Sequence, residues 1–185
     1  NVKLGFNLIN TATKKCPFRY DICYKKSTVS GHLLSHKQPL RAHELIFVFY
    51  EKQPFYDISS HKHKFKGTDI DKRPTKNYKN NSKIYGKINR PDYKRKNGES
   101  VYYPPLPKSV LEIKSEKLKH STQKPLSLMK WILMYYSKEG DTILDCCMGS
   151  GSMGVACKEM KREFIGIEKD NEIFEVAKNR INILL

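Results

Sequence analysis

The 185-residue sequence contains no long hydrophobic run. A membrane-spanning helix needs about 20 consecutive apolar residues, and no stretch approaches that length. The N-terminal residues also lack the arrangement of a secretory signal peptide. We therefore expect no membrane association.

Cysteine is scarce, and its spacing is not that of a metal site. The five cysteines are odd in number and include no C-x-x-C pair: Cys16, Cys23, Cys146, Cys147 and Cys157. This pattern argues against a disulfide framework and against a zinc site. We expect a reduced, cytoplasmic setting without a bound metal, and we expect the three C-terminal cysteines to pack in the core.

Acidic residues are scarce in the first part of the chain. Residues 1–119 hold 26 Lys and Arg against 10 Asp and Glu, whereas residues 120–185 hold nine of each. The whole net charge of +16 therefore lies in residues 1–119. A basic excess confined to one region indicates a polyanionic partner, although a solvated lysine-rich loop would explain it equally well.

Strand-forming residues are concentrated at 18–25 and 43–52. The second segment is apolar nearly throughout, which is typical of a strand buried on both faces. Residues 53–108 have weak periodicity and many Lys, Asn, Gly and Pro residues, which predicts either a small irregular subdomain or a flexible insertion.

The pattern is clearer in the C-terminal third. A helix is predicted from about Pro125 to Gly140, and further elements follow in the order strand, glycine-rich loop, helix, strand and helix. The predicted ranges of these strands and helices are 141–147, 152–162, 163–170 and 171–185. This order predicts one βαβα unit of a parallel sheet.

The loop after the first of these strands reads G-x-G-x-x-G from Gly149 to Gly154. Its glycines would let the backbone approach a ligand, and Glu168, at the end of the next strand, could bind both hydroxyls of a ribose. These features suit NAD and S-adenosylmethionine alike. Asp145 at the carboxyl end of the strand would repel a pyrophosphate but suit an ammonium and a sulfonium. An NAD fold beginning here would also need several more βα units, so the sequence favours S-adenosylmethionine.

The segment from "HSTQKP" at residue 120 through "LDCCMGSGSMG" to residue 182 closely resembles the C-terminal part of amino-group DNA methyltransferases of the permuted (β) order. A looser resemblance covers residues 30–57 and is to phage-type members. The family implies an α/β, Rossmann-like fold, S-adenosylmethionine as cofactor and double-stranded DNA as substrate. The methylated atom would be adenine N6, the favoured target, or cytosine N4, in a restriction-modification or phage setting. An RNA or small-molecule methyltransferase fits "STQKP" less well.

The resemblance also assigns regions and residues. Residues 1–52 and 120–185 would form the methyltransferase core, and residues 53–119 a basic DNA-recognition insertion. The implied cofactor loop contains Asp145, Cys147, Gly149, Ser150 and Gly151, with Glu168 on the ribose. A motif before the loop would contact the methionine end of the cofactor through His120, Thr122, Gln123 and Lys124. The candidates for DNA contacts are Arg41, which is the favoured phosphate contact, and Lys37, Lys62, Lys64, Lys72 and Arg73.

One motif of the family is absent. Its members place Asp, Asn or Ser before Pro-Pro and an aromatic residue, so that the target amino group is hydrogen-bonded and the flipped base is stacked. The single Pro-Pro of this sequence, Pro104-Pro105, lacks both the polar residue before it and the aromatic residue after it. We expect the motif in a missing N-terminal segment or a partner subunit, with a restriction enzyme as a further partner. The alternative is an inactive remnant that still binds cofactor or DNA. Without the strand that carries the motif the sheet would be incomplete, with open edges and low stability.

Overall fold

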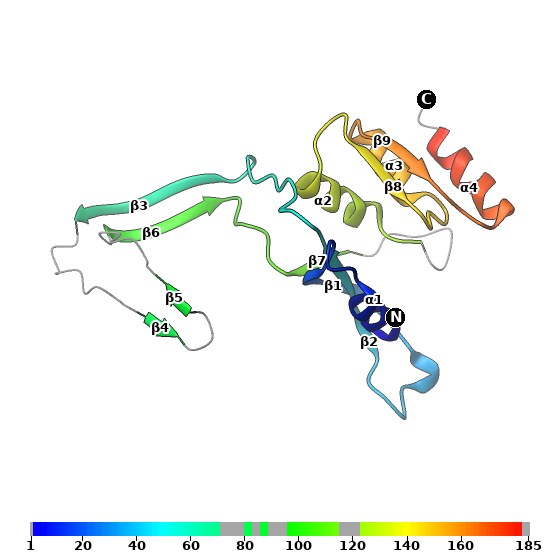
Figure 1. The fold of residues 1–185 in the computed structure, drawn as a ribbon, viewed down its shortest axis with the longest axis horizontal. Coiled ribbons are helices and arrows are strands. Elements are labelled where there is room, and N and C mark those ends of the chain that lie inside the picture. The colour runs from blue at the N-terminus through cyan, green and yellow to red at the C-terminus, as the bar shows by residue number, and fades with distance from the viewer. Residues whose placement is uncertain (1, 71–79, 83–85, 89–95, 115–122, 183–185) are drawn as a thin grey trace. The chain divides into compact units, whose positions relative to one another are not determined.

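The computed structural model describes residues 2–70, 80–82, 86–88, 96–114 and 123–182. The chain forms two compact units (Figure 1). The first consists of Asn1–Ile58 and Lys108–Leu185, and the second of Ser59–Pro107. The predicted insertion, 53–119, brackets the second unit, and its role in DNA recognition stays a prediction.

A three-stranded sheet forms one half of the first unit. Its strands lie in the order β2 (Arg41–Phe49), β1 (Phe18–Ser30) and β7 (Val110–Ile113). β1 runs antiparallel to β2 and parallel to β7. Because side chains alternate between the two faces of a strand, one face collects the apolar residues of all three strands. This face is covered by α2 (Leu126–Tyr136), and the resulting core is centred on Ile22, Tyr24, Leu111 and Leu128.

The opposite face of this sheet contacts α1 (Val2–Thr11). A Cβ atom at Gly5 would overlap the Phe47 ring, so α1 approaches β2 closely at that glycine. The Phe18 ring packs edge-on against both Phe47 and Phe49, at 5.9 and 5.7 Å between centroids. α1 and β7 were not predicted from the sequence, because elements of ten and four residues are too short to establish a clear periodicity.

The predicted βαβα unit is confirmed. It consists of β8 (Thr142–Asp145), α3 (Ser152–Glu159), β9 (Glu163–Gly166) and α4 (Asn171–Asn182), and the two strands pair in parallel. A second core cluster of Leu133, Ala156 and Cys157 joins α2 to α3. α2 therefore packs on both halves of the first unit through different residues. Figure 1 shows α2 beside α3 and the β8–β9 pair.

The predicted incomplete sheet is also present. Within the described part of the chain, β8 and β9 share no ladder hydrogen bonds with β2, β1 or β7. The outer face of the β8–β9 pair leaves Leu144, Ile165 and Ile167 more than half exposed. The fold is thus α/β with a partial sheet.

Two expectations about burial are wrong. β2 is not buried on both faces, since it is an edge strand of a small sheet and none of its residues is fully buried. Cys157 is buried, but Cys146 and Cys147 are exposed, because the strand ends at Asp145 and both side chains lie in the turn beyond it.

The second unit contains two antiparallel pairs. β3 (Lys62–Ile70) pairs with β6 (Lys96–Tyr103), and β4 (Asn80–Ser82) pairs with β5 (Gly86–Ile88). At its base the buried His61 forms a 2.8 Å hydrogen bond between Nδ1 and the Pro104 carbonyl. None of the helices that the structure describes is long and apolar enough to cross a membrane.

Candidate cofactor site

The glycine loop connects β8 to α3 and is joined by hydrogen bonds to the segment that follows β9. The Ile167 amide donates to the Asp145 carbonyl at 2.9 Å, and the Met148 amide donates to the Ile167 carbonyl at 3.0 Å. Asp145 also accepts a hydrogen bond on Oδ1 from the Cys147 amide at 3.1 Å. The turn is therefore fixed by the backbone at the carboxyl ends of two parallel strands, the edge where open α/β sheets bind ligands.

Glu168 is positioned by three backbone amides. Its Oε2 accepts from Gly149 at 2.9 Å, and its Oε1 accepts from Lys169 at 2.9 Å and from Asp170 at 3.1 Å. These hydrogen bonds, that of Asp170 foremost, hold the pKa of the Glu168 carboxyl below its usual value. A carboxylate oxygen can accept about two hydrogen bonds, so Oε2 keeps capacity for a hydroxyl donor. The carboxylate thus fixes the loop and remains charged at neutral pH.

The glycines of the motif serve different purposes. Gly149 (φ +52°) and Gly151 (φ +78°) both have left-handed backbone conformations. A Cβ atom at Gly149 would meet nothing within 4 Å, whereas at Gly151 it would lie 3.0 Å from the Ala177 Cβ atom of α4. At Gly154 it would lie 2.7 Å from the Phe164 ring of β9. Gly149 therefore leaves open space beside the backbone, while Gly151 and Gly154 allow close packing.

Two further residues at the loop were not predicted from the sequence. Arg180 of α4 donates through Nη1 to the Ser150 carbonyl and, at 2.9 Å, to Ser150 Oγ. Burial lowers the pKa of the Arg180 guanidinium, though it stays charged. Ser152, the first residue of α3, has a hydroxyl shielded from solvent without a hydrogen-bond partner in the described structure. Arg180 follows the loop by 30 positions, so no local pattern could have linked it to Ser150.

The other predicted cofactor residues lie before α2. Gln123 is half-buried, and Lys124 forms an ion pair at 2.5 Å with Glu44 Oε2 of β2. His120 and Thr122 lie outside the described residues. Their contact with a cofactor stays a prediction.

The predicted DNA-binding residues fall in both units. Lys37, Arg41 and Lys62 are exposed, and Lys64 lies on β3. Lys72 and Arg73 lie outside the described residues. Among the cysteines, burial raises the pKa of Cys157 to about 11, so this thiol stays protonated and unreactive.

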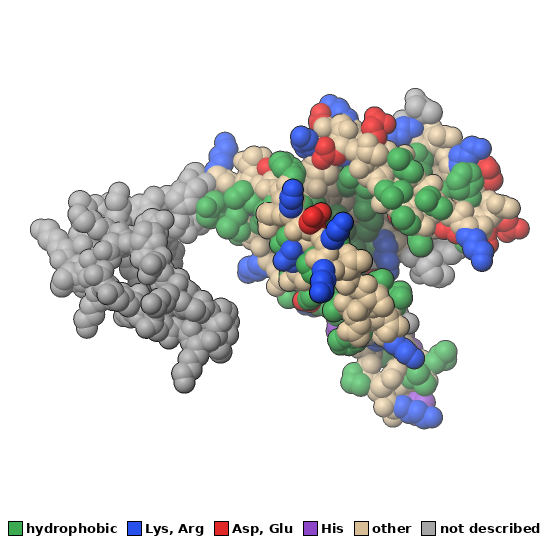
Figure 2. Space-filling view, in the orientation of Figure 1, with side chains coloured by type: hydrophobic (Ala, Val, Ile, Leu, Met, Phe, Trp, Pro, Cys, Tyr) green, Lys and Arg blue, Asp and Glu red, His purple; other side chains and the backbone are tan. Residues whose placement is uncertain are grey.

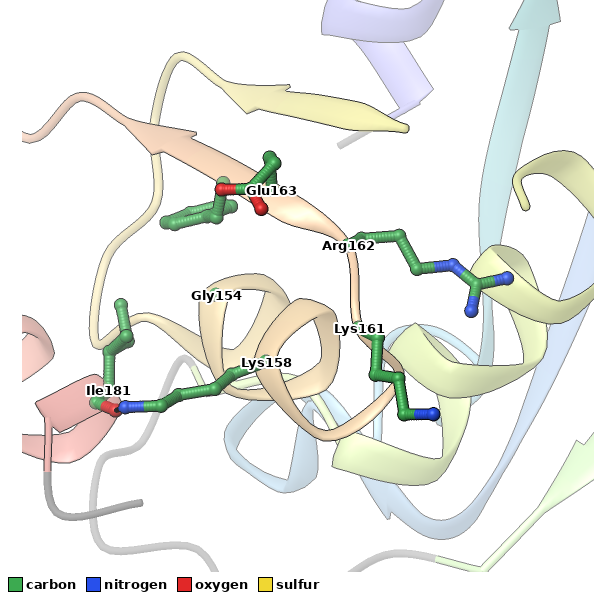
Figure 3. Close-up of a pocket in the computed structure, with 7 residues that line it drawn as sticks. Gly154, Lys158, Lys161, Arg162, Glu163 and Ile181 are labelled. Atoms are coloured by element: carbon green, nitrogen blue, oxygen red, sulfur yellow. Dashed lines mark hydrogen bonds between the residues drawn. The ribbon is translucent and has the colours of Figure 1, made fainter. Parts of the chain in front are cut away.

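A pocket of about 350 Å³ lies near the C-terminal end of α3, away from the glycine loop (Figure 3). Its basic residues already have protein partners: Lys158 Nζ donates to the Ile181 carbonyl at 2.8 Å, and Arg162 donates to Ser137 Oγ at 3.1 Å. It lies at the amino end of β9 and not at the carboxyl ends of the strands. We assign it a structural role.

Comparison with known proteins agrees with this geometry. A family model described as DNA methylase matches residues 1–179, and the chain belongs to this family. The Type II methyltransferase M2.LlaDCHI of Lactococcus lactis subsp. cremoris is 46% identical over 71 residues, which are 37% of this chain and 26% of that protein. The Type II methyltransferase M.HindIII of Haemophilus influenzae is 47% identical over 64 residues, which are 35% of this chain and 21% of that protein. The chain thus spans about a quarter of the length of the curated relatives that it matches.

Solved structures share the fold. The M1.HpyAVI–SAM complex matches with a TM-score of 0.61 and 23% identity, covering 98% of this chain and 71% of that one. The cytosine-N4-specific PvuII DNA methyltransferase matches with a TM-score of 0.63 and 13% identity, covering 97% of this chain and 56% of that one. The predicted α/β methyltransferase fold is confirmed.

Proposed function

We propose that the chain binds S-adenosylmethionine at the glycine loop and acts in a site-specific DNA methyltransferase. The single observation that carries this proposal is the geometry of the loop. The Glu168 carboxylate accepts a hydrogen bond from the Gly149 amide, and the space beside Gly149 is open. Two structural features fit the cofactor: the empty position beside Gly149 and the unpartnered Ser152 hydroxyl at the start of α3. The SAM complex of a protein with the same fold adds support.

Each residue of the loop has a role in this proposal. Glu168 Oε2 accepts from a ribose hydroxyl, and the Asp145 carboxylate attracts the ammonium and sulfonium charges. Ser150 is held by Arg180 and shapes the loop, and the exposed Cys147 lies beside the cofactor. His120, Thr122, Gln123 and Lys124 contact the methionine end. The bound cofactor supplies an electrophilic methyl group.

The substrate in this proposal is double-stranded DNA in the cytoplasm, methylated at an exocyclic amino group. Adenine N6 is the favoured target, and cytosine N4 is the target named for the PvuII enzyme. Because Pro104-Pro105 lacks the flanks of the catalytic motif, the chain alone is expected to bind without transferring methyl groups. The motif would come from a further segment or a partner subunit, and the setting would be restriction-modification or phage DNA methylation.

Calorimetry of cofactor binding tests the proposal. Wild type should bind S-adenosylmethionine and not NAD. Asp145→Asn keeps an acceptor for the Cys147 amide but removes the charge, so affinity should fall about tenfold or more. Asp21→Asn is the matched control, because it removes a carboxylate from an exposed position of β1. This variant should bind S-adenosylmethionine as tightly as wild type does. Binding of NAD, or an unchanged affinity in Asp145→Asn, would show that the loop serves another ligand.

A further inference from the structure

The loop that joins β1 to β2 is exposed along its whole length. All ten residues from 31 to 40 are exposed, and Leu33 exposes 94% of its surface. Leu34 and Leu40 expose 46% and 37%. Single exposed leucines are common on protein surfaces, but three within eight residues at one hairpin end form an apolar tip. We call Leu33 and Leu34, the two most exposed of these three leucines, the leucine tip.

The leucine tip lies on a turn that is closed by backbone hydrogen bonds. Residues His32–Leu34 form a 3-10 helix, which follows Gly31 at φ +94°. The Leu34 amide donates to the Gly31 carbonyl at 3.0 Å, and the Leu34 carbonyl accepts from Lys37 at 2.9 Å and Gln38 at 3.0 Å. The loop therefore presents its leucines on a hydrogen-bonded turn. Figure 2 shows hydrophobic, basic and histidine side chains together at the end of this hairpin.

The charge around the leucine tip has one sign. Residues 25–43 contain four Lys or Arg residues and three His residues but no Asp or Glu. Lys25 and Lys26 pair with Glu112 and Glu44. Lys37 and Arg41 form no ion pair among the described residues, and both are exposed. Two free cations thus flank an apolar tip, and such a surface fits a polyanion with an apolar interior.

We propose that the leucine tip is a wedge that enters between base pairs of duplex DNA, while Lys37 and Arg41 contact phosphates on either side. Stacked bases offer an apolar interior behind charged phosphates, and proteins unstack base steps by inserting such side chains. This inference rests on the proposed DNA methyltransferase function. It adds a means of opening the duplex, which an enzyme acting on a base amino group requires.

Fluorescence anisotropy with two duplexes tests the wedge. One duplex is fully paired, and the other has the same sequence with a single internal mismatch, where unstacking costs less. Wild type should bind the mismatched duplex about tenfold more tightly. Leu33→Ala combined with Leu34→Ala should lose this preference while keeping the salt dependence of binding. Lys37→Ala combined with Arg41→Ala should keep the preference for the mismatched duplex. The slope of log affinity against log salt concentration should decrease in magnitude by about 2.

Controls separate this proposal from its alternatives. Val176→Ala truncates an apolar side chain of α4 that is about as exposed as Leu34, and it should leave the affinity for both duplexes unchanged. Circular dichroism should show that both hairpin variants fold.

Two outcomes would overturn the wedge alone. In the first, the leucine variant still prefers the mismatched duplex. In the second, the wild type binds DNA but does not prefer the mismatched duplex. Failure to bind either duplex would overturn the DNA-binding proposal as well. Binding to phosphatidylserine vesicles that depends on the leucines, without an effect on DNA, would replace the wedge with a membrane contact.

Discussion

At the residue scale, three glycines with left-handed backbone conformations distinguish the cost of backbone strain from the cost of overpacking by an added Cβ atom. Gly140 (φ +84°), Gly149 and Gly151 all have positive φ angles, but only Gly151 is packed against a neighbouring helix. A left-handed alanine costs about 1–2 kcal/mol in each position. At Gly151 the added Cβ would also press against Ala177, which adds about 1–3 kcal/mol.

We therefore predict that Gly151→Ala lowers the free energy of unfolding more than Gly140→Ala or Gly149→Ala does. Gly149→Ala should match Gly140→Ala in stability yet weaken S-adenosylmethionine binding, because its methyl group fills the open space of the loop. Thermal unfolding and calorimetry measure the two effects. Equal losses of stability in all three variants would show that α4 does not pack on the loop as described.

At the scale of elements, the C-terminus of α3 ends in a Schellman motif. The Arg162 amide donates to the Cys157 carbonyl at 2.8 Å, and the Lys161 amide donates to the Lys158 carbonyl at 3.2 Å. Lys161 takes the left-handed position (φ +58°) that glycine usually occupies there. Its side chain is largely exposed and forms a 3.7 Å ion pair with Glu139, an exposed pair that contributes little.

Lys161→Gly should accordingly stabilise the chain by about 1 kcal/mol through relief of the left-handed strain. Lys161→Ala is the matched control, since it removes the same ion pair but keeps the strain, and it should leave stability nearly unchanged. Urea unfolding of both variants measures the difference. The explanation fails if the two substitutions have the same effect.

On the scale of the whole molecule, the first unit consists of two small sheets that α2 joins. The β8–β9 pair leaves apolar side chains exposed on one face, and its strands form no ladder with the three-stranded sheet in the described residues. Apolar area left in contact with water contributes nothing to stability.

We predict that the isolated 185-residue chain unfolds in urea with a low midpoint and a shallow slope, because the slope scales with the surface exposed on unfolding. Circular dichroism across a urea series measures both quantities. A steep transition at high urea would mean that the partial sheet is sufficient for a stable fold.

The sequence by itself determined the features that depend on neighbouring residues. The βαβα order, the glycine loop and the position of Asp145 and Glu168 at strand ends could be predicted because periodicity and backbone preference are local properties. The charge distribution, which depends on composition alone, was equally accessible.

Only the tertiary structure decided features that depend on distant residues. It distinguished the open Gly149 from the packed Gly151, brought Arg180 to Ser150, exposed Cys146 and Cys147, and placed two leucines at the hairpin end. Each of these outcomes depends on which elements cover a residue, and that covering comes from contacts between parts of the chain far apart in sequence.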